Sequence, residues 1–292
     1  MDVKCSYHDL YKAARQLLRQ VDGETAEFTA RQLVAVATDR TVAQLVADFP
    51  LTVFQRDIDK TNELVQRHIN GEPLAYILGQ WEFHGLTLNV TRDVLIPRDD
   101  TEAVCELAIG KSLQLPQNPR ILDLCAGSGC IGLAIAAQVK DARVTLGEIS
   151  PEAIRVAKKN IQDNHLAGRV SCIELDVREE PPRFLGKYDL IVSNPPYITA
   201  EQMEHLDTSV KDFEPRLALY GGLDGLDYYR AITKNFTPIL KPGGYLCFEF
   251  GMGQEASVCQ ILMEHGYVLG RLVRDSGERA RAVLAQKPTR EE

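Results

Sequence analysis

Short apolar strands alternate with helical segments from Arg120 onward, and this order constrains the fold of the chain more than any other feature. The expected strands are Ile121–Leu124, Val144–Glu148, Val170–Leu175, Tyr188–Ser193, Tyr245–Phe250, Tyr267–Val273 and Ala280–Ala285. Strands that alternate with helices form a mostly parallel sheet with helices on both faces. The sequence therefore predicts an α/β domain with a doubly wound sheet over residues 99–292.

The first part of the chain, residues 1–75, has helical periodicity and almost no strand signal. Ser6 can cap a first helix, a second apolar stripe lies at Phe28–Ala37, and a further helix is expected over Asp57–Ile69. Acidic and basic residues nearly balance here, so this part is not a basic arm. We predict an N-terminal helical domain that recognises a macromolecular substrate or braces the main domain.

Residues 76–98 connect these two parts. Gln80–Phe83 and Leu86–Val90 have the composition of short strands, and they flank His84-Gly85. This arrangement is typical of a β-hairpin, so we expect a hairpin linker.

Composition excludes several classes of protein. The 292 residues carry a formal net charge of −8, whereas a protein that binds duplex nucleic acid usually presents a basic surface. The seven cysteines include no C-x-x-C pair and the six histidines no H-E-x-x-H spacing, so we expect reduced thiols and no metal site. The N-terminus has no apolar signal-peptide region, and no apolar run is long enough to span a membrane. We therefore expect a cytoplasmic protein with no membrane and no direct nucleic-acid partner. We also expect a monomer, although the sequence does not determine the oligomeric state.

A glycine-rich stretch joins the first strand of the sheet to its helix. The loop residues expected to contact a cofactor are Cys125, Ala126, Gly127, Ser128 and Gly129. With Gly132 they satisfy G-x-G-x-x-G, and the carboxylate of Glu148, about twenty residues on, can accept hydrogen bonds from a ribose diol. After the third strand, the Asp176 carboxylate and the Val177 N–H are placed to bind an adenine. The pattern predicts a nucleotide-type cofactor but does not separate a nicotinamide from S-adenosylmethionine.

The stretch Asn194-Pro195-Pro196-Tyr197 follows a strand at the edge where open α/β sheets bind ligands. Each residue before a proline is pushed to an extended conformation, and the prolines have fixed φ and no N–H. The result is a stiff loop with free carbonyl oxygens, one amide side chain and one aromatic ring. Such a loop suits a planar group with an NH2, whose hydrogens Asn194 and a proline carbonyl accept while Tyr197 covers one face.

These motifs, together with several others, resemble those of one enzyme family. The others include Gly71-Glu72-Pro73-Leu74-Ala75-Tyr76-Ile77, Val94-Leu95-Ile96-Pro97-Arg98, Glu214-Pro215-x-x-Ala218-Leu219 and Glu249-x-Gly251-x-x-Gln254. The chain is similar to the release-factor glutamine methyltransferase family (PrmC/HemK), a branch of the class I S-adenosylmethionine-dependent methyltransferases. The resemblance implies a seven-stranded, Rossmann-like domain. It also implies methylation of the side-chain amide nitrogen (N5) of the Gly-Gly-Gln glutamine in class 1 peptide chain release factors, a modification that belongs to translation termination.

The chain departs from the family pattern in the cofactor loop. Cys125-Ala126 stands where the family usually has Gly-Thr, and Glu148 stands where it usually has Asp. A contact made by the backbone survives the first change, and the longer carboxylate can still bind a ribose. We expect these changes to alter fine cofactor contacts and not the reaction.

The resemblance gives the Asn-Pro-Pro-Tyr loop its role. On this hypothesis Asn194, Pro195, Pro196 and Tyr197 bind and orient the substrate amide, and Asn194 also touches the methionine end of the cofactor. No general base is needed, because the methylated nitrogen becomes acidic and loses a proton to water. Two alternatives are a methyltransferase acting on adenine N6 in nucleic acid and a nicotinamide-dependent oxidoreductase. The acidic net charge speaks against the first, and the second leaves the loop unexplained.

Overall fold

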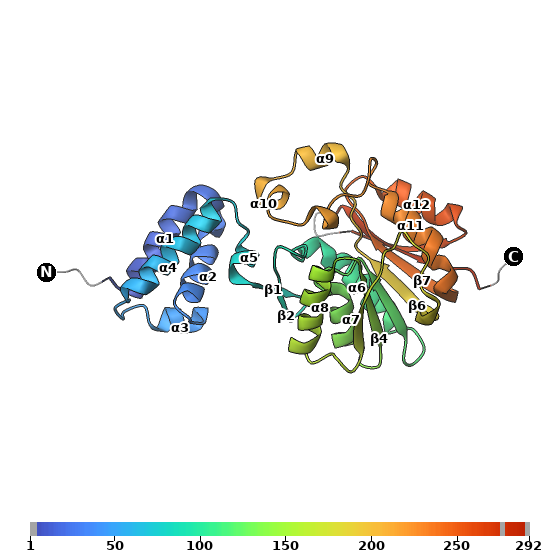
Figure 1. The fold of residues 1–292 in the computed structure, drawn as a ribbon, viewed down its shortest axis with the longest axis horizontal. Helices are drawn as coiled ribbons and strands as arrows, with labels where there is room; N and C mark the ends of the chain where they lie inside the picture. Colours follow the sequence, from blue (N-terminus) through green and yellow to red (C-terminus); the bar gives the residue numbers. More distant parts are fainter. Residues whose placement is uncertain (1–4, 275–277, 290–292) are drawn as a thin grey trace. The chain divides into compact units, whose positions relative to one another are not determined.

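The computed structural model describes residues 5–274 and 278–289, and the chain divides into two compact units. The first unit comprises Met1–Gln80 and Thr208–Phe213, and the second comprises Trp81–Asp207 and Glu214–Glu292 (Figure 1). A short segment from late in the chain therefore groups with the N-terminal helices.

The first unit is helical. Its helices are α1 (Tyr7–Asp22), α2 (Ala26–Ala37), α3 (Val42–Ala47), α4 (Gln55–Ile69), α5 (Leu74–Leu78) and α10 (Thr208–Lys211), with a 3-10 turn, η1, at Gly23–Thr25. Ser6 caps α1 as predicted, since its hydroxyl accepts from the Asp9 N–H while Asp9 accepts from the Ser6 N–H. The predicted stripe of α2 is partly wrong: Leu33 and Val34 are buried, but Phe28 is 52% exposed.

The second unit contains the predicted α/β fold with a seven-stranded sheet. Its strands are β3 (Arg120–Leu124), β4 (Arg143–Glu148), β5 (Val170–Glu174), β6 (Tyr188–Ser193), β7 (Leu240–Glu249), β8 (Val268–Arg274) and β9 (Ala280–Gln286). They lie in the order β5-β4-β3-β6-β7-β9-β8. Strands β3 to β7 are parallel, and β9 pairs antiparallel with β7 and β8. The predicted hairpin, β1 (Gln80–Phe83) and β2 (Leu86–Asn89), forms a separate two-stranded sheet.

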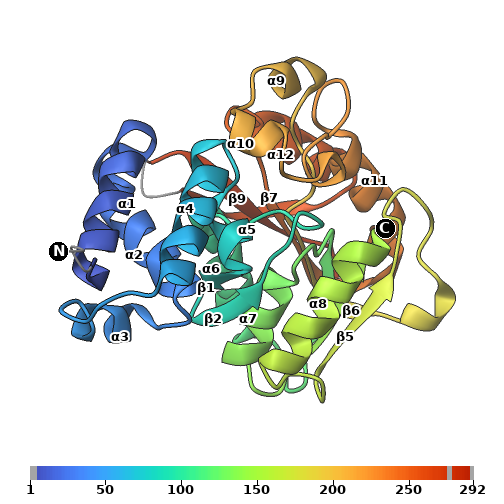
Figure 2. The same cartoon turned by 60° about the vertical axis from the view of Figure 1, so that its left-hand side comes forward.

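Helices pack on both faces of this sheet. The helices of the unit are α6 (Glu102–Ser112), α7 (Cys130–Gln138), α8 (Pro151–Asp163), α9 (Ala200–Glu204), α11 (Asp227–Phe236) and α12 (Glu255–Glu264), with 3-10 turns η2 (Asp99–Thr101), η3 (Arg183–Leu185), η4 (Arg216–Ala218) and η5 (Thr237–Ile239). Successive strand residues point to opposite faces. Ile121 and Leu190 pack with α6, α7 and α8, whereas Leu122 and Ile191 pack with α11 and α12. Helix α8 packs beside β5, the strand at one end of the sheet (Figure 2).

Local sequence signals fixed most element ends. The Ser150 hydroxyl accepts from the Ala153 N–H and caps α8, whose first residue is Pro151. Strand β7 is an exception, because it begins at Leu240 and not at Tyr245 as predicted. Its early part pairs with Tyr188 across a register shift, so a stretch with the turn-like residues Pro and Gly still belongs to the strand.

The parallel strands bring their carboxyl ends to one edge of the sheet. Along the chain, the strand order reverses at β3: β4 and β5 lie on one side of it, and β6 and β7 lie on the other. Ligands of open α/β sheets bind at such a switch point. The loops that follow β3, β4 and β6 are therefore candidates for a site.

The seven cysteines are all free. Within residues 5–274 and 278–289, no helix is long and apolar enough to cross a membrane. The same residues contain no group of three or more His, Cys, Asp or Glu side chains that could hold a metal ion.

Two helical glycines make a matched pair for a stability test. A Cβ on Gly132 in α7 would clash with Leu146 and lie 3.0 Å from Asp123 Oδ2, whereas a Cβ on Gly110 in α6 meets nothing within 4 Å. We expect Gly132→Ala to lower the unfolding free energy by about 1–3 kcal/mol through overpacking. Gly110→Ala should raise it by up to about 1 kcal/mol, because alanine is the better helix former. Urea unfolding measures both, and a Gly132→Ala protein as stable as the parent would contradict this packing.

Candidate functional site

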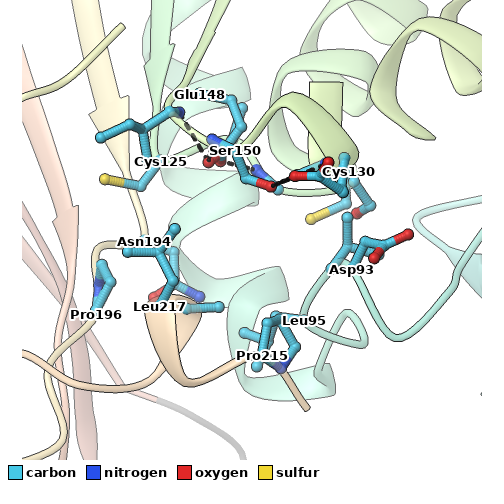
Figure 3. Close-up of a pocket in the computed structure, with 18 of the residues that line it drawn as sticks. Asp93, Leu95, Cys125, Cys130, Glu148, Ser150, Asn194, Pro196, Pro215 and Leu217 are labelled. Carbon is cyan, nitrogen blue, oxygen red and sulfur yellow. Dashed lines mark hydrogen bonds between the residues drawn. The ribbon is translucent and has the colours of Figure 1, made fainter. Parts of the chain in front are cut away.

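A cavity of about 220 Å³ opens at this edge of the sheet, within the second unit. Its walls come from the loops after β3 and β6, the ends of β4 and β5, and residues 92–97 and 215–218 (Figure 3). The predicted site residues that line it are Cys125, Ala126, Gly127, Ser128, Glu148, Asp176, Val177, Asn194 and Pro196. Within the described chain, Gly129, Pro195 and Tyr197 are not among the lining residues.

The loop after β3 turns through left-handed backbone conformations. Cys125, Gly127 and Gly129 have φ values of 57°, 53° and 82°, and the Gly129 N–H donates to the Ala126 carbonyl at 2.7 Å. Glycine adopts such values freely, but a side chain makes them costly, so Cys125 is strained. A Cβ on Gly127 would meet nothing within 4 Å, so the backbone faces open space there.

Asp123 lies beneath this loop and is 1% exposed. Its Oδ2 accepts from the Gly132 N–H at 2.8 Å, and its Oδ1 has no hydrogen-bond partner among the described residues. Burial raises the pKa of this carboxyl to about 7, against the lowering effect of the Gly132 N–H, while Glu148 raises it further. Asp123 therefore braces the first turn of α7 and does not line the cavity.

Glu148, the last residue of β4, accepts hydrogen bonds from three backbone N–H groups. Its Oε2 accepts from Gly127 at 2.8 Å, and its Oε1 accepts from Ile149 at 2.9 Å and Ser150 at 3.0 Å. A carboxylate has about four acceptor positions, so one is left for a ligand. Glu148 thus joins the glycine loop to the start of α8. A contact with both hydroxyls of a ribose, as the sequence predicts, would require that the carboxylate share an acceptor position.

Asp176 follows β5 and is paired with Arg178. Its Oδ1 accepts from the Arg178 N–H and Nε at 2.9 Å each, and its Oδ2 accepts from Nη2 at 2.7 Å. These side-chain hydrogen bonds lower the pKa of Asp176. Val177 is buried, and its carbonyl accepts from Asn235 Nδ2 at 3.1 Å. The sequence did not predict Arg178, which also lines the cavity.

Asn194 directly follows β6, and its side chain lies in the cavity wall (Figure 3). The Ser193 hydroxyl donates to the Leu124 carbonyl at 2.7 Å and ties β6 to β3 beneath it. Asn194 Nδ2 donates to Thr101 Oγ1 at 3.2 Å. Because its NH2 has a protein partner, Asn194 Oδ1 is the atom left for a ligand.

Tyr197 packs against three glycines of neighbouring loops. A Cβ on Gly221 would lie 2.7 Å from the Tyr197 Cα, and one on Gly251 would lie 2.9 Å from its ring. Gln254 fastens this cluster, since its Nε2 donates to the carbonyls of Tyr197 at 3.0 Å and Gly225 at 3.2 Å while its Oε1 accepts from the Gly251 N–H at 3.0 Å. Burial raises the pKa of the Tyr197 hydroxyl. The ring packs beside Gly251, and its predicted contact with the face of a substrate amide stays a prediction.

An ion pair with a buried carboxylate holds two wall segments that the sequence did not predict as site residues. The Glu214 side chain is 1% exposed, pairs with Arg98, and accepts from the Ile96 N–H at 3.2 Å. It thereby joins residues 92–97 to residues 215–218. The pair spans 116 positions of sequence. Local composition gives no sign of it, and the only signal was that both segments occur among the family motifs.

Two family models match the chain. Residues 9–79 match the model described as PrmC N-terminal domain, and residues 108–213 match the methyltransferase small domain. A release factor glutamine methyltransferase of Clostridium acetobutylicum is 43% identical over 213 residues, which cover 73% of this chain and 74% of that protein. One of Geobacter sulfurreducens is 38% identical over 253 residues, which cover 87% of each.

Solved structures show likeness at the level of the fold. The catalytic domain of hMettl16, solved in complex with a MAT2A 3'UTR hairpin, has a TM-score of 0.53 at 15% identity and covers 81% of this chain and 82% of its own. A methyltransferase from Pyrococcus furiosus has a TM-score of 0.52 at 16% identity and covers 76% of this chain and 97% of its own. These neighbours support the methyltransferase fold and no particular substrate.

The structure gives Gln254 a testable role in holding the loops together. Gln254→Ala leaves two carbonyls and one N–H without their partner, so we expect the unfolding free energy to fall by about 1–3 kcal/mol. Gln260→Ala is the matched control, because Gln260 Nε2 makes one exposed bond to Glu264 in the same helix. That change should stay within about 0.5 kcal/mol. Equal stability of the two variants in urea unfolding would contradict the role of Gln254.

Proposed function

The chain belongs to the release factor glutamine methyltransferase family, and on this premise we propose that it methylates a glutamine side-chain amide of class 1 peptide chain release factors. The family resemblance implies that the acceptor is the glutamine of the Gly-Gly-Gln motif. One observation carries the proposal: Asn194 stands in the cavity wall with Nδ2 held by Thr101 and Oδ1 left to accept an amide hydrogen.

S-adenosylmethionine is the methyl donor that we propose, and the cavity residues fit it. Gly127 leaves open space beside the loop backbone, and Glu148 keeps one acceptor position for a ribose hydroxyl. Asp176 and Val177 line the same cavity and would hold the adenine. The other loop residues that we propose to contact the cofactor are Cys125, Ala126, Ser128 and Gly129. When bound, the donor supplies a methyl carbon that its positively charged sulfur makes electrophilic.

The protein must orient the acceptor, because an amide nitrogen is a poor nucleophile whose lone pair is delocalised into the carbonyl. Asn194 Oδ1 in the cavity wall accepts one amide hydrogen. We assign the other to the carbonyl of Pro195, which follows Asn194 directly but is not among the described residues that line the cavity, and the two acceptors hold the nitrogen in one orientation. The same two acceptors favour the positive charge that develops on nitrogen. Pro195 and Pro196 keep the loop stiff, and we assign to Tyr197 the task of anchoring it through Gln254. The methylated nitrogen then loses its proton to water.

Adenine N6 in nucleic acid is the alternative acceptor, because its exocyclic NH2 offers the same two hydrogens. The formal net charge of −8 and the family favour the protein substrate. Labelled methyl transfer separates the two when a release factor, its Gly-Gly-Gln Gln→Ala variant and adenine-containing DNA are compared side by side. We expect label in the intact release factor alone. Label in the DNA, or undiminished label in the variant, would refute the proposal.

Glu148 gives a prediction for cofactor affinity. Glu148→Ala removes the ribose acceptor and releases the Gly127 N–H, so S-adenosylmethionine binding should weaken by about 1.5–3 kcal/mol. Glu152→Ala is the matched control, because Glu152 also lines the cavity but is half exposed and pairs with Arg155. Calorimetry measures both affinities. Unchanged binding by a folded Glu148→Ala protein would remove Glu148 from the cofactor site.

Asn194 gives a prediction for the rate. Asn194→Ala removes one of the two amide acceptors, which should lower the single-turnover rate by about 10²–10³, or about 2.7–4 kcal/mol in the barrier. The contact strengthens as charge develops, so the loss should fall on kcat and not on KM for the release factor. If Asn194 only shapes the turn, the melting temperature and both kinetic parameters change together. A folded variant with the parent rate would rule out the mechanism.

A further inference from the structure

Glu249 is a buried acid at the end of β7 that has no part in the reaction described so far. Ser193 pairs with Phe248 in the sheet, so Asn194 and Glu249 leave neighbouring parallel strands side by side. Glu249 is 2% exposed, and its Oε2 has no hydrogen-bond partner in the described chain. An unpaired buried oxygen costs stability. Its place beside Asn194, at the edge where the ligand binds, points to a function.

Thr101 links this acid to the amide of Asn194. The residue is 2% exposed, its Oγ1 accepts from Asn194 Nδ2 at 3.2 Å, and hydrogen bonding by the side chains of both Thr101 and Asn194 lowers the pKa of the Glu249 carboxyl. A hydroxyl has one proton to donate, and an ionised carboxylate only accepts. While Glu249 is ionised, the Thr101 proton therefore goes to Glu249, and a lone pair of Oγ1 faces Asn194.

The direction of the hydrogen bonds at Thr101 then decides which end of the Asn194 amide faces the cavity. The oxygen and the NH2 of an asparagine have nearly the same shape, so packing alone does not choose between them. We infer that Glu249 is a positioning residue, which acts directly and through Thr101 to hold Asn194 with Nδ2 toward the protein and Oδ1 toward the substrate. This inference deepens the proposed function and rests on it for the identity of the substrate.

Several charged and titratable groups face Glu249 from the elements around it. They are Asp100 and Arg281, which form an ion pair at 2.8 Å, together with Tyr197, Tyr229 and Cys130. Burial raises the pKa of Glu249 to about 8, against the lowering effects of Thr101, Arg281 and Asn194, while Asp100 raises it. Below that pH the carboxyl has a proton that it can donate to Thr101, so the hydroxyl is free to turn. The amide orientation is therefore locked as the pH rises through this value.

The side-chain NH2 signals of Asn194 in 15N-labelled protein report the orientation without any substrate. Their disappearance in Asn194→Ala identifies them. We expect these signals to titrate with a midpoint near pH 8 in the parent and to be insensitive to pH in Glu249→Gln. Signals that do not titrate in the parent, or that titrate equally in Glu249→Gln, would overturn the inference.

Single-turnover methylation of a release factor tests the consequence for the rate. Above pH 8, where the parent carboxyl is ionised, we expect Glu249→Gln and Thr101→Val each to lower the rate about tenfold, or about 1.4 kcal/mol, with an unchanged KM. Thr101→Ser keeps the hydroxyl and should keep the parent rate. Because Glu249 acts only through Asn194, Glu249→Gln should have no further effect in the Asn194→Ala protein.

A merely structural role predicts a different outcome. Glu249→Gln would then lower the melting temperature and slow the parent and the Asn194→Ala protein by the same factor, and that result overturns the inference. So does a Glu249→Gln protein with the parent rate. A parent that transfers no methyl group to the release factor contradicts the proposed function instead, and the NMR titration then decides the role of Glu249 by itself.

Discussion

The carboxylate of Glu148 accepts hydrogen bonds from three backbone N–H groups in two loops, and the shape of the cavity depends on these bonds. A loop in left-handed conformations cannot pair all its donors within itself, and an unpaired buried donor is costly. One oxygen of Glu148 takes the N–H of Gly127, and the other takes two at the start of α8, where the helix dipole favours negative charge. The glycine loop and α8 are thus fixed by one acid, and a cofactor hydroxyl would join an arrangement already in place.

Buried acids recur at the edge of the sheet where the cavity lies, and two of them hold backbone segments in place. Asp123 braces the first turn of α7, and Glu214 joins two wall segments through Arg98 and a backbone N–H. Glu249 lies beside Asn194 with one oxygen unpaired. Such groups cost stability unless they are satisfied, so their concentration at one edge is expected where a protein maintains a preorganised site. The buried acids therefore lie at the edge of the sheet where the reaction is proposed to occur.

The fold followed from sequence because apolar runs, glycine turns and helix caps act locally. Ser150 and Pro151 fixed the start of α8, and the strand over Tyr188–Ser193 has the predicted bounds. Errors arose where tertiary context decides. In the apolar stripe over Phe28–Ala37, Leu33 is buried as predicted but Phe28 is exposed. Strand β7 starts early because pairing with β6 outweighs the turn signal of its one proline and two glycines.

The candidate site followed from sequence only in part. The glycine loop, Glu148 and Asn194 could be predicted because each lies within a few residues of a strand end. Thr101 and Glu249 could not, because the first sits 93 positions from its partner Asn194, and the family motif that contains the second gives it no role. The packing of Tyr197 on Gly251 could not be predicted from the sequence either, since it depends on the absence of a side chain in another loop. Contacts between distant segments are the part that local patterns do not encode.

Transfer to the amide nitrogen is the central claim, and one measurement tests it at the level of the bond. A release factor labelled with 15N in its glutamine side chains is incubated with the enzyme and with S-adenosylmethionine that has a 13C methyl group. The account predicts a one-bond coupling between the new 13C methyl and the 15N of the Gly-Gly-Gln glutamine. A 13C methyl that is transferred but coupled to no side-chain 15N, or to that of a different glutamine, would contradict it.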